Sequence, residues 1–247
     1  MIEKIDLHKK EQKIYGELYV PDRDRFPLLI ICHGLGGELE GSRDFAIDLC
    51  QHEIAAFIFD FCGGSYVSRS DGKTTQMSVL SEAEDLETVI DHFQKDERIE
   101  KILLMGKSQG AYVSTLVASK RPTEIAGLIG LYSGFMLRDK VEEELEKYEE
   151  IPEEEVLLWL KVGRKYFEDL LSTDIYESMK HCSMDVLLIH GDKDDIAPIS
   201  YSEKALNYFP KARLVTLKGA DHGFHGPERE DVVKMVREFV ECHIKML

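Results

Sequence analysis

The sequence predicts an α/β protein in which a mostly parallel sheet is flanked by helices and carries a helical cap insertion. Three observations lead to this prediction. Short apolar runs alternate with helical stripes along the 247 residues, a pattern typical of a sheet covered on both faces. One of these runs leads directly into a Gly-x-Ser-x-Gly turn. Two later runs end in turns that contain acids and histidines.

The first part of the chain contains four apolar runs that predict strands. Ile2–Leu7 and Lys13–Tyr19 are expected to pair antiparallel, and Phe26–Cys32 and Ala55–Phe59 to form core strands. A helix is expected next, because residues 81–84 match a capping box. Apolar residues at helical spacing form its core stripe, namely Leu80, Ala83, Leu86, Val89, Ile90 and Phe93.

The second part of the chain continues the alternation. Ile102–Met105 is expected to be the strand before the serine turn, and the further strands are expected at Ile125–Tyr132, Val186–His190 and Arg213–Leu217. The expected final helix has a core stripe of Val232, Val233, Val236, Phe239, Val240 and Ile244. We therefore expect a core formed by residues 1–134 and 182–247, and a cap insertion over residues 135–181.

Residues 106–110 read Gly-Lys-Ser-Gln-Gly and match a nucleophile elbow. The sharp turn forces Ser108 into a strained backbone, and the flanking glycines relieve the crowding. The helix that follows directs its free N–H groups at the same point. A phosphate-binding P-loop is excluded, because its first glycine would fall at Lys101 and an apolar strand occupies the place of its loop.

An acidic turn and a histidine turn follow the last two expected strands. Residues 190–198 contain the candidate acids Asp192, Asp194 and Asp195. Residues 219–225 contain the candidate bases His222 and His225. Ligands bind at the carboxyl ends of the strands in sheets of this kind, so we expect the serine, an acid and a histidine to meet there. Their chain order differs from the orders of chymotrypsin and subtilisin.

Together, these motifs indicate a resemblance to a known family. The chain resembles the α/β-hydrolase superfamily, and more closely the small bacterial carboxylesterases that include the cinnamoyl and feruloyl esterases. The resemblance covers nearly the whole chain. It implies an α/β-hydrolase fold with Ser108 as nucleophile, Asp194 as acid and His222 as base. It also implies that the backbone N–H groups of Leu35, in a His-Gly-x-x-Gly turn, and of Gln109 form an oxyanion hole.

The chain departs from these esterases at three positions. Lys107 stands where His is common, Ala111 where a second glycine is common, and Leu35 where an aromatic residue is common in the feruloyl enzymes. None of the departures removes a catalytic atom, since Leu35 and Gln109 would act through their backbones. They do weaken a specific expectation of feruloyl substrates.

Other polar residues near these motifs have structural interpretations. Asp192 or Asp195 is expected to cap a turn or the next helix, and His225 to lie at the rim of the site. His33 and His190 each precede a glycine at a strand end, where a histidine bonded to nearby backbone is expected. The spacing of the histidines matches no zinc motif, and serine chemistry needs no organic group, so neither metal nor cofactor is expected.

Composition narrows the classes of partner. The net charge of −16 argues against nucleic acid and anionic membranes. The sequence lacks an apolar run of ~20 residues, as a membrane span requires, and an N-terminal signal pattern, so we expect a cytoplasmic protein. Five cysteines without CxxC spacing are expected to be free thiols in a reducing compartment. The sequence leaves a homodimer open.

The insertion at 135–181 is expected to cover the site as a cap. Ten acids lie between Asp139 and Glu155, and most of them are expected on a solvated face, with cation binding as the alternative. Apolar side chains at helical spacing are expected to pack on the core, and a few to line an acyl pocket, for which Trp159 is the candidate. Such a cap often moves to admit substrate.

The function predicted from the sequence is that of a serine carboxylesterase acting on small to medium acyl or aryl esters. Another serine hydrolase on the same scaffold is the first alternative: an aminopeptidase, a thioesterase or an acylglycerol lipase. A non-catalytic binding module is the second alternative, because a fold alone does not fix function. The expected ligand is a small-molecule ester.

Overall fold

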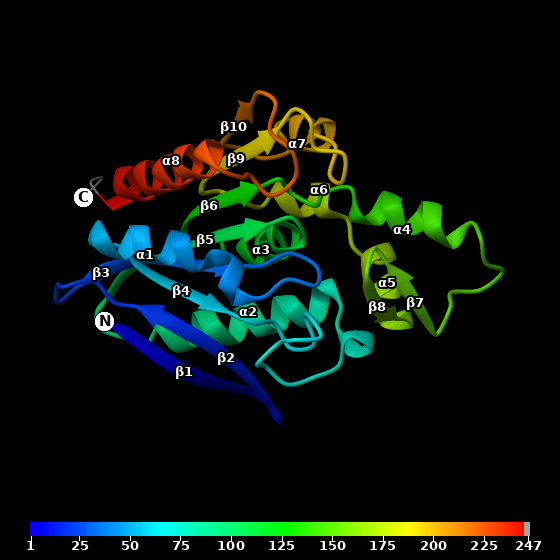
Figure 1. Ribbon diagram of the computed structural model, residues 1–247, viewed down its shortest axis with the longest axis horizontal. Helices are drawn as coiled ribbons and strands as arrows, with labels where there is room; N and C mark the ends of the chain where they lie inside the picture. Colours follow the sequence, from blue (N-terminus) through cyan, green and yellow to red (C-terminus); the bar gives the residue numbers. More distant parts are fainter. Residues whose placement is uncertain (245–247) are drawn as a thin grey trace.

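The computed structural model describes residues 1–244 and has the mostly parallel sheet that the sequence predicts (Figure 1). Its eight strands lie in the order β1-β2-β4-β3-β5-β6-β9-β10. β1 and β2 pair antiparallel, β2 pairs antiparallel with β4, and the other neighbours are parallel. The strands are β1 Ile2–Lys9, β2 Gln12–Tyr19, β3 Phe26–Cys32, β4 Ala55–Phe59, β5 Ile99–Lys107, β6 Ile125–Leu131, β9 Asp185–Gly191 and β10 Ala212–Leu217.

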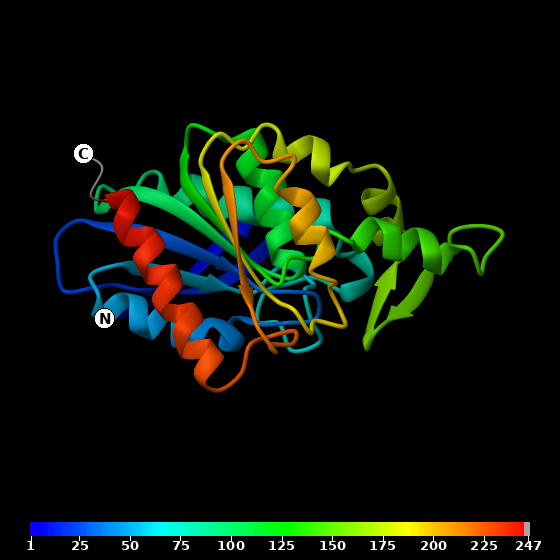
Figure 2. The same cartoon turned by 90° about the horizontal axis from the view of Figure 1, so that it is seen from above.

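Helices cover both faces of this sheet because side chains alternate along each strand. Ile30 and Leu104 join one buried cluster with α2 (Val79–Phe93) and α3 (Gln109–Lys120). Ile31 and Met105 join a second cluster with α1 (Arg43–Gln51) and α8 (Pro227–Ile244). Figure 2 shows α8 and α3 on opposite sides of the sheet. Strands buried on both faces explain the continuous apolar runs in the sequence.

The insertion is helical except for one hairpin. It contains α4 (Leu137–Leu145), the strands β7 (Glu154–Leu157) and β8 (Leu160–Gly163), α5 (Arg164–Leu171) and α6 (Ile175–Met179). Figures 1 and 2 show α4 and the hairpin projecting from one end of the molecule. In β8, buried Leu160 and Val162 flank exposed Lys161. The run of apolar residues at 157–160 spans the hairpin turn, so its spacing misleadingly suggests a helix.

Two details of the helices differ from the sequence predictions. The predicted capping box at residues 81–84 is wrong, because α2 begins one turn earlier: Ser78 is its N-cap and exchanges hydrogen bonds with Ser81. A serine at the third position thus completes the box in place of glutamate. In α8, Val232, Val236 and Val240 are buried as expected, and the side chain of Ile244 lies outside the described residues.

The remaining connections contain short helical turns. These are η1 (Leu39–Ser42), η2 (Thr74–Gln76) and α7 (Ser200–Ala205). The five cysteines are free, as predicted. In the described part of the chain, the helices lack the combination of length and apolar character that a bilayer crossing requires.

Candidate active site

Ser108 lies in a strained turn between β5 and α3. Its φ of 52° and ψ of −118° place it outside the regions that a serine normally adopts. A Cβ at Gly106 would lie 2.2 Å from the Gly110 carbonyl oxygen, and a Cβ at Gly110 would lie 2.4 Å from the Cys32 carbonyl oxygen. Both glycines are therefore sterically required, and the expected crowding of the turn is confirmed.

A second tight turn approaches Ser108 from the end of β3. Gly37 donates its N–H to the Gly34 carbonyl at 3.0 Å, and Gly36 has a φ of 67°, as the third residue of a type II turn requires. A Cβ at Gly34 would lie 3.7 Å from Ser108 Oγ. Leu35 is thereby brought beside the serine, where Gln109 also begins α3 with an N–H that has no partner inside its helix.

His33 fixes the start of this turn. The Phe61 N–H donates to His33 Nε2 at 3.1 Å, so the Nδ1–H donates to the Gly34 carbonyl at 2.8 Å. Burial lowers the pKa of His33 to about 4, because the imidazolium would be desolvated. The prediction was a structural histidine bonded to nearby backbone, and these contacts confirm it.

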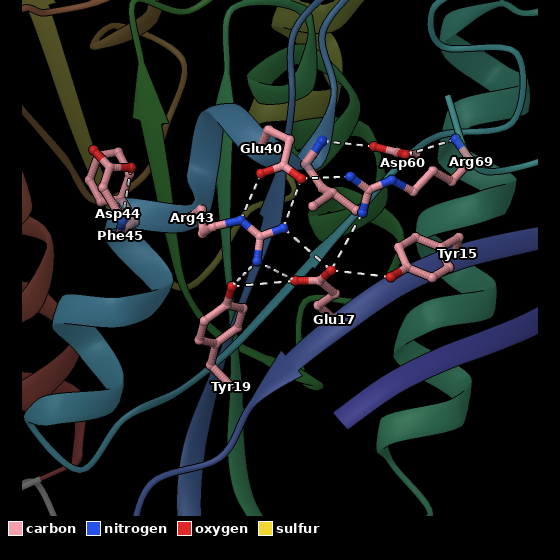
Figure 3. A network of polar contacts seen from close by, with 10 residues as sticks. Tyr15, Glu17, Tyr19, Glu40, Arg43, Asp44, Phe45, Asp60 and Arg69 are labelled. Atoms are coloured by element: carbon pink, nitrogen blue, oxygen red, sulfur yellow. Dashed lines mark hydrogen bonds and ion pairs between the residues drawn. The ribbon is translucent and has the colours of Figure 1, made fainter. Parts of the chain in front are cut away.

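A network of ion pairs holds the segment that follows the turn (Figure 3). Asp60 accepts the backbone N–H groups of Leu39 at 2.7 Å and of Arg69 at 2.9 Å. Arg43 pairs with buried Glu17 at 2.6 Å and also bonds Glu40 beside it. The network joins β2, η1 and the loop after β4, and it thereby stabilises the segment that follows the Leu35 turn.

His222 and Asp194 meet at the carboxyl ends of β9 and β10. His222 Nδ1 lies 2.8 Å from Asp194 Oδ2, and the backbone N–H groups of Ile196 and Ala197 donate to the other oxygen at 3.0 and 2.8 Å. These three donors suit an ionised carboxylate. Nδ1–H of His222 then points at Asp194, which leaves Nε2 as the proton acceptor.

Two histidines hold the Asp194 carboxylate in its charged form. Burial alone would raise the pKa of Asp194, but hydrogen bonds from His190 and His222 outweigh it and lower the pKa well below its usual range. His190 is fully buried, and its Nε2 lies 3.2 Å from Asp194 Oδ2 and 2.7 Å from the Ala197 carbonyl. The prediction that His190 is bonded to nearby backbone is confirmed, and its contact with the acid was missed.

Tyr132 was also missed by the sequence prediction. It follows β6 with a φ of 37°, and its ring packs edge-on against His222 at 4.6 Å between centroids. The same ring contacts Phe224 at 5.1 Å. The sequence signal for this role was a polar aromatic residue at the carboxyl end of a strand. It was overlooked because Tyr132 was counted as the last residue of the expected strand Ile125–Tyr132.

The predicted residues come together around one cavity of about 370 Å³, which Leu35, Ser108 and His222 line. Lys107 and Tyr132 also line it. Trp159 reaches it from the hairpin tip and is 58% exposed. A Cβ at Gly36 would lie 2.7 Å from the Trp159 indole nitrogen, so this side chain rests on the Leu35 turn.

Two further cavities adjoin this central one. Beyond Leu35 and Leu158, an apolar cavity of about 200 Å³ extends under the cap, where Met136, Val141 and Tyr166 line it. On the other side, beyond Tyr132, a more open cavity of about 600 Å³ contains charged residues of α1 and α8. The site therefore has one apolar and one charged neighbour.

The Gln109 side chain turns away from these cavities into a buried network. Its Nε2 donates to Glu82 Oε2 at 2.8 Å, and its Oε1 accepts the Tyr166 hydroxyl at 2.7 Å. Burial raises the pKa of Glu82 to about 8, so the carboxyl group is largely neutral at pH 7. Through Tyr166 on α5, this network ties the elbow to the cap.

The other candidates for the acid and the base, Asp192, Asp195 and His225, lie outside the central cavity. Asp192 accepts the Gly219 N–H at 2.6 Å, which confirms that a neighbouring acid caps a turn. His225 lines the charged cavity rather than the central one. Asp195 is exposed.

Comparisons with known proteins agree with this architecture. A family model described as serine aminopeptidase, S33, matches residues 24–175, and one described as TAP-like protein matches residues 172–242. A search of curated proteins gave no match.

Solved structures with the same fold span the whole chain. Est1E from Butyrivibrio proteoclasticus with ferulic acid bound is 24% identical, with a TM-score of 0.90 over 97% of this chain and 99% of that one. DcsB in complex with its substrate analogue is 19% identical, with a TM-score of 0.82 over 98% and 100%. The monoacylglycerol lipase of Paleococcus ferrophilus is 20% identical, with a TM-score of 0.72 over 93% and 99%.

Proposed function

The chain belongs to the serine aminopeptidase S33 family of α/β hydrolases, and on that premise we propose that it is a serine carboxylesterase. One observation carries the proposal. His222, oriented by Asp194 at 2.8 Å, lines the same cavity as Ser108 and Leu35. That set of groups suits acyl transfer through a covalent intermediate.

The reaction follows from these positions. Ser108 Oγ attacks the ester carbonyl carbon while its proton passes to His222 Nε2. The N–H groups of Leu35 and Gln109 bind the oxyanion, and each such donor contributes roughly 2.7–4 kcal/mol. The C–O bond to the alcohol then breaks, and His222 returns the proton to the departing oxygen. Water attacks the acyl-enzyme by the same route, which releases the acid and restores Ser108.

The apolar cavity under the cap favours small to medium acyl groups. Its volume of about 200 Å³ is below the ~300–1,000 Å³ typical of drug-sized ligands. Met136, Val141 and Tyr166 provide an apolar and aromatic lining, which suits a short aliphatic or a single aryl acyl group.

The family description makes an aminopeptidase the main rival. Such an enzyme needs carboxylates close to the reacting centre to bind the substrate ammonium. Glu38 and Lys107 both line the central cavity. Lys107 is the buried one of the two and directly precedes Ser108, so its cation would repel an ammonium group at the reacting centre. This charge favours an ester substrate.

The test is a panel of aryl esters, with acyl groups from acetyl to long-chain and hydroxycinnamoyl, assayed beside aminoacyl-anilides and acyl thioesters. Ester turnover should exceed the others, and Ser108→Ala should lower kcat at least about 10⁴-fold. Ser119→Ala is the matched control, since Ser119 lies in the same helix and bonds the Leu116 carbonyl. Preference for anilides would establish the peptidase instead, and an active Ser108→Ala variant would refute the serine mechanism.

A further inference from the structure

Lys107 is a buried cation beside Ser108, and the proposed reaction does not use it. The residue is 7% exposed, yet it lines the central cavity. Its Nζ donates to the Gly41 carbonyl at 2.6 Å. An ammonium group has three donors, so this single contact leaves two of them for another acceptor.

Among the residues that the structure describes, no carboxylate contacts this ammonium group. Within residues 1–244, no acidic oxygen lies within 4.0 Å of Lys107 Nζ. Buried charges are normally paired. Burial and the nearby Arg229 lower the pKa of Lys107 to about 7, while Asp44 acts weakly against them. The group therefore lies where an anionic ligand would restore its charge.

Arg229 on α8 converges on the same point. Its Nη2 donates to the Gly41 carbonyl at 3.1 Å, the acceptor that Lys107 also uses. Asp44 orients the guanidinium through contacts of 2.6 and 2.7 Å, and the ring of Phe45 lies 4.0 Å below it. Two cations thus meet at one carbonyl, and only one of them has a carboxylate partner among the described residues.

Lys107 lines the central cavity and Arg229 the charged cavity beside it. Gly41, Tyr132 and Gly223 line both the central cavity and the charged cavity that Arg229 lines. His222 gives its proton to the departing oxygen, and Gly223 follows it directly. The acyl group has its own apolar cavity beyond Leu35, so the charged cavity is the place for the alcohol portion.

We propose that Lys107 and Arg229 form an anion subsite that binds a carboxylate on the alcohol portion of the ester. The proposal rests on the proposed esterase function and specifies its substrate class. The acids that line the charged cavity are already paired, Glu40 with Arg43 and Arg69, and Asp44 with Arg229. Lys107 has no carboxylate partner among the described residues, so a negatively charged substrate gains attraction there.

The experiment compares two esters with the same acyl group: butyryl esters of 4-(hydroxymethyl)benzoate and of 4-(hydroxymethyl)benzamide. At low salt the wild type should favour the carboxylate ester about tenfold in kcat/KM, mainly through KM. Lys107→Met should bring the ratio to about one, and this ratio of kcat/KM values, rather than the absolute activity of the variant, is the quantity that tests the subsite. A sulfonate analogue of the alcohol distinguishes general anion binding from carboxylate recognition.

Lys101→Met is the matched control. Lys101 lies on the same strand, and its Nζ donates to the His243 carbonyl at 2.6 Å, so it repeats the contact of Lys107 at the far end of β5. It should leave the ratio unchanged. If Lys107→Met lowers kcat/KM equally for both esters, or if the wild type shows no preference for the carboxylate ester, the subsite is refuted. If neither ester is cleaved by the wild type, the esterase proposal itself fails.

Discussion

The two residues that flank Ser108 send their side chains to opposite faces of the sheet, into environments of different kinds. Gln109 enters a hydrogen-bonded and largely neutral network with Glu82 and Tyr166. Lys107 enters the α1 and α8 side, where its cation has one carbonyl acceptor among the described residues, that of Gly41 at 2.6 Å. A satisfied buried network rigidifies a structure, whereas an incompletely paired charge at a cavity wall is suited to a ligand.

The comparison teaches how one turn serves two purposes. The backbone of the elbow is fixed by steric constraints at Gly106 and Gly110, so its flanking side chains are free to differ in role. On the Gln109 side, the hydrogen bonds reach Tyr166 and connect the elbow to the cap. On the Lys107 side, Gly41 connects the elbow to α1 and α8 and to the cavity where we place the alcohol.

Paired methionine substitutions test this division most strongly. Gln109→Met would leave the Tyr166 hydroxyl and the Glu82 carboxyl buried without their partner, so we expect the free energy of unfolding to fall by about 2–5 kcal/mol. Lys107→Met removes a buried ammonium without a carboxylate partner, and Arg229 still bonds the Gly41 carbonyl. We expect its stability at pH 6 to stay equal to the wild type or to rise.

Urea unfolding at pH 6 measures both effects. Gln51→Met is the control, because Gln51 is exposed at the end of α1, and it should change stability by less than about 0.5 kcal/mol. Equal losses in the two methionine variants would show that Lys107 is as much a part of the scaffold as Gln109, and the contrast between the two sides would disappear.

The pH dependence of stability should differ in sign between the two sides. Lys107 has a folded pKa of about 7 against a reference of 10.5, so between these values the unfolded chain binds more protons and stability rises with pH. Glu82 has a folded pKa of about 8 against 4.5, so between those values stability falls as pH rises.

The difference between wild type and Lys107→Met isolates the lysine. From pH 7 to 9 the wild type should gain about 2 kcal/mol relative to the variant. The charged and titratable groups facing Lys107 are Arg229, Asp44 and His33, and all three are retained in both proteins. Parallel stability curves would show that the ammonium group is not desolvated as the structure indicates.

The sequence identified the site where chemistry is encoded locally. The elbow, the Asp194 turn and the His222 turn each follow an apolar strand, and the resemblance to the related esterases distinguished Asp194 from Asp192 and Asp195. The catalytic roles of these residues stay a prediction. The hairpin at 154–163 was missed because its apolar run spans the turn.

The contacts that distinguish the two sides of Ser108 could not be read from the sequence. Gln109 and Tyr166 lie 57 positions apart, and Lys107 and Gly41 lie 66 apart. Such pairs depend on how the cap and α1 pack against the elbow. Lys107 gave a partial signal, as a departure from the related esterases, but the sequence contained no information on its burial or its acceptor.

The smallest effect is expected at the tip of the cap hairpin, where Trp159 is 58% exposed. In the comparison of the Gln109 and Lys107 sides, the cap is connected to the core through Tyr166. Trp159→Ala should therefore leave the free energy of unfolding within about 0.5 kcal/mol of the wild type. We propose that its indole, which lies over Gly36 at the mouth of the central cavity, contacts the substrate. The variant should therefore raise KM for aryl esters roughly threefold to tenfold with little change in kcat, because one aromatic contact contributes about 0.5–1.5 kcal/mol.

Val156→Ala is the matched control for this measurement. Val156 lies on the same hairpin and is 55% exposed, but it is absent from the residues that line the central cavity. A KM change confined to Trp159→Ala would show that the hairpin tip contributes to substrate binding. The connection between cap and core would then depend on Tyr166 alone, as we expect. An equal KM change in Val156→Ala, or a loss of stability in Trp159→Ala, would mean that the hairpin acts by positioning the whole cap. The connection between cap and core would then include residues outside the Gln109 network.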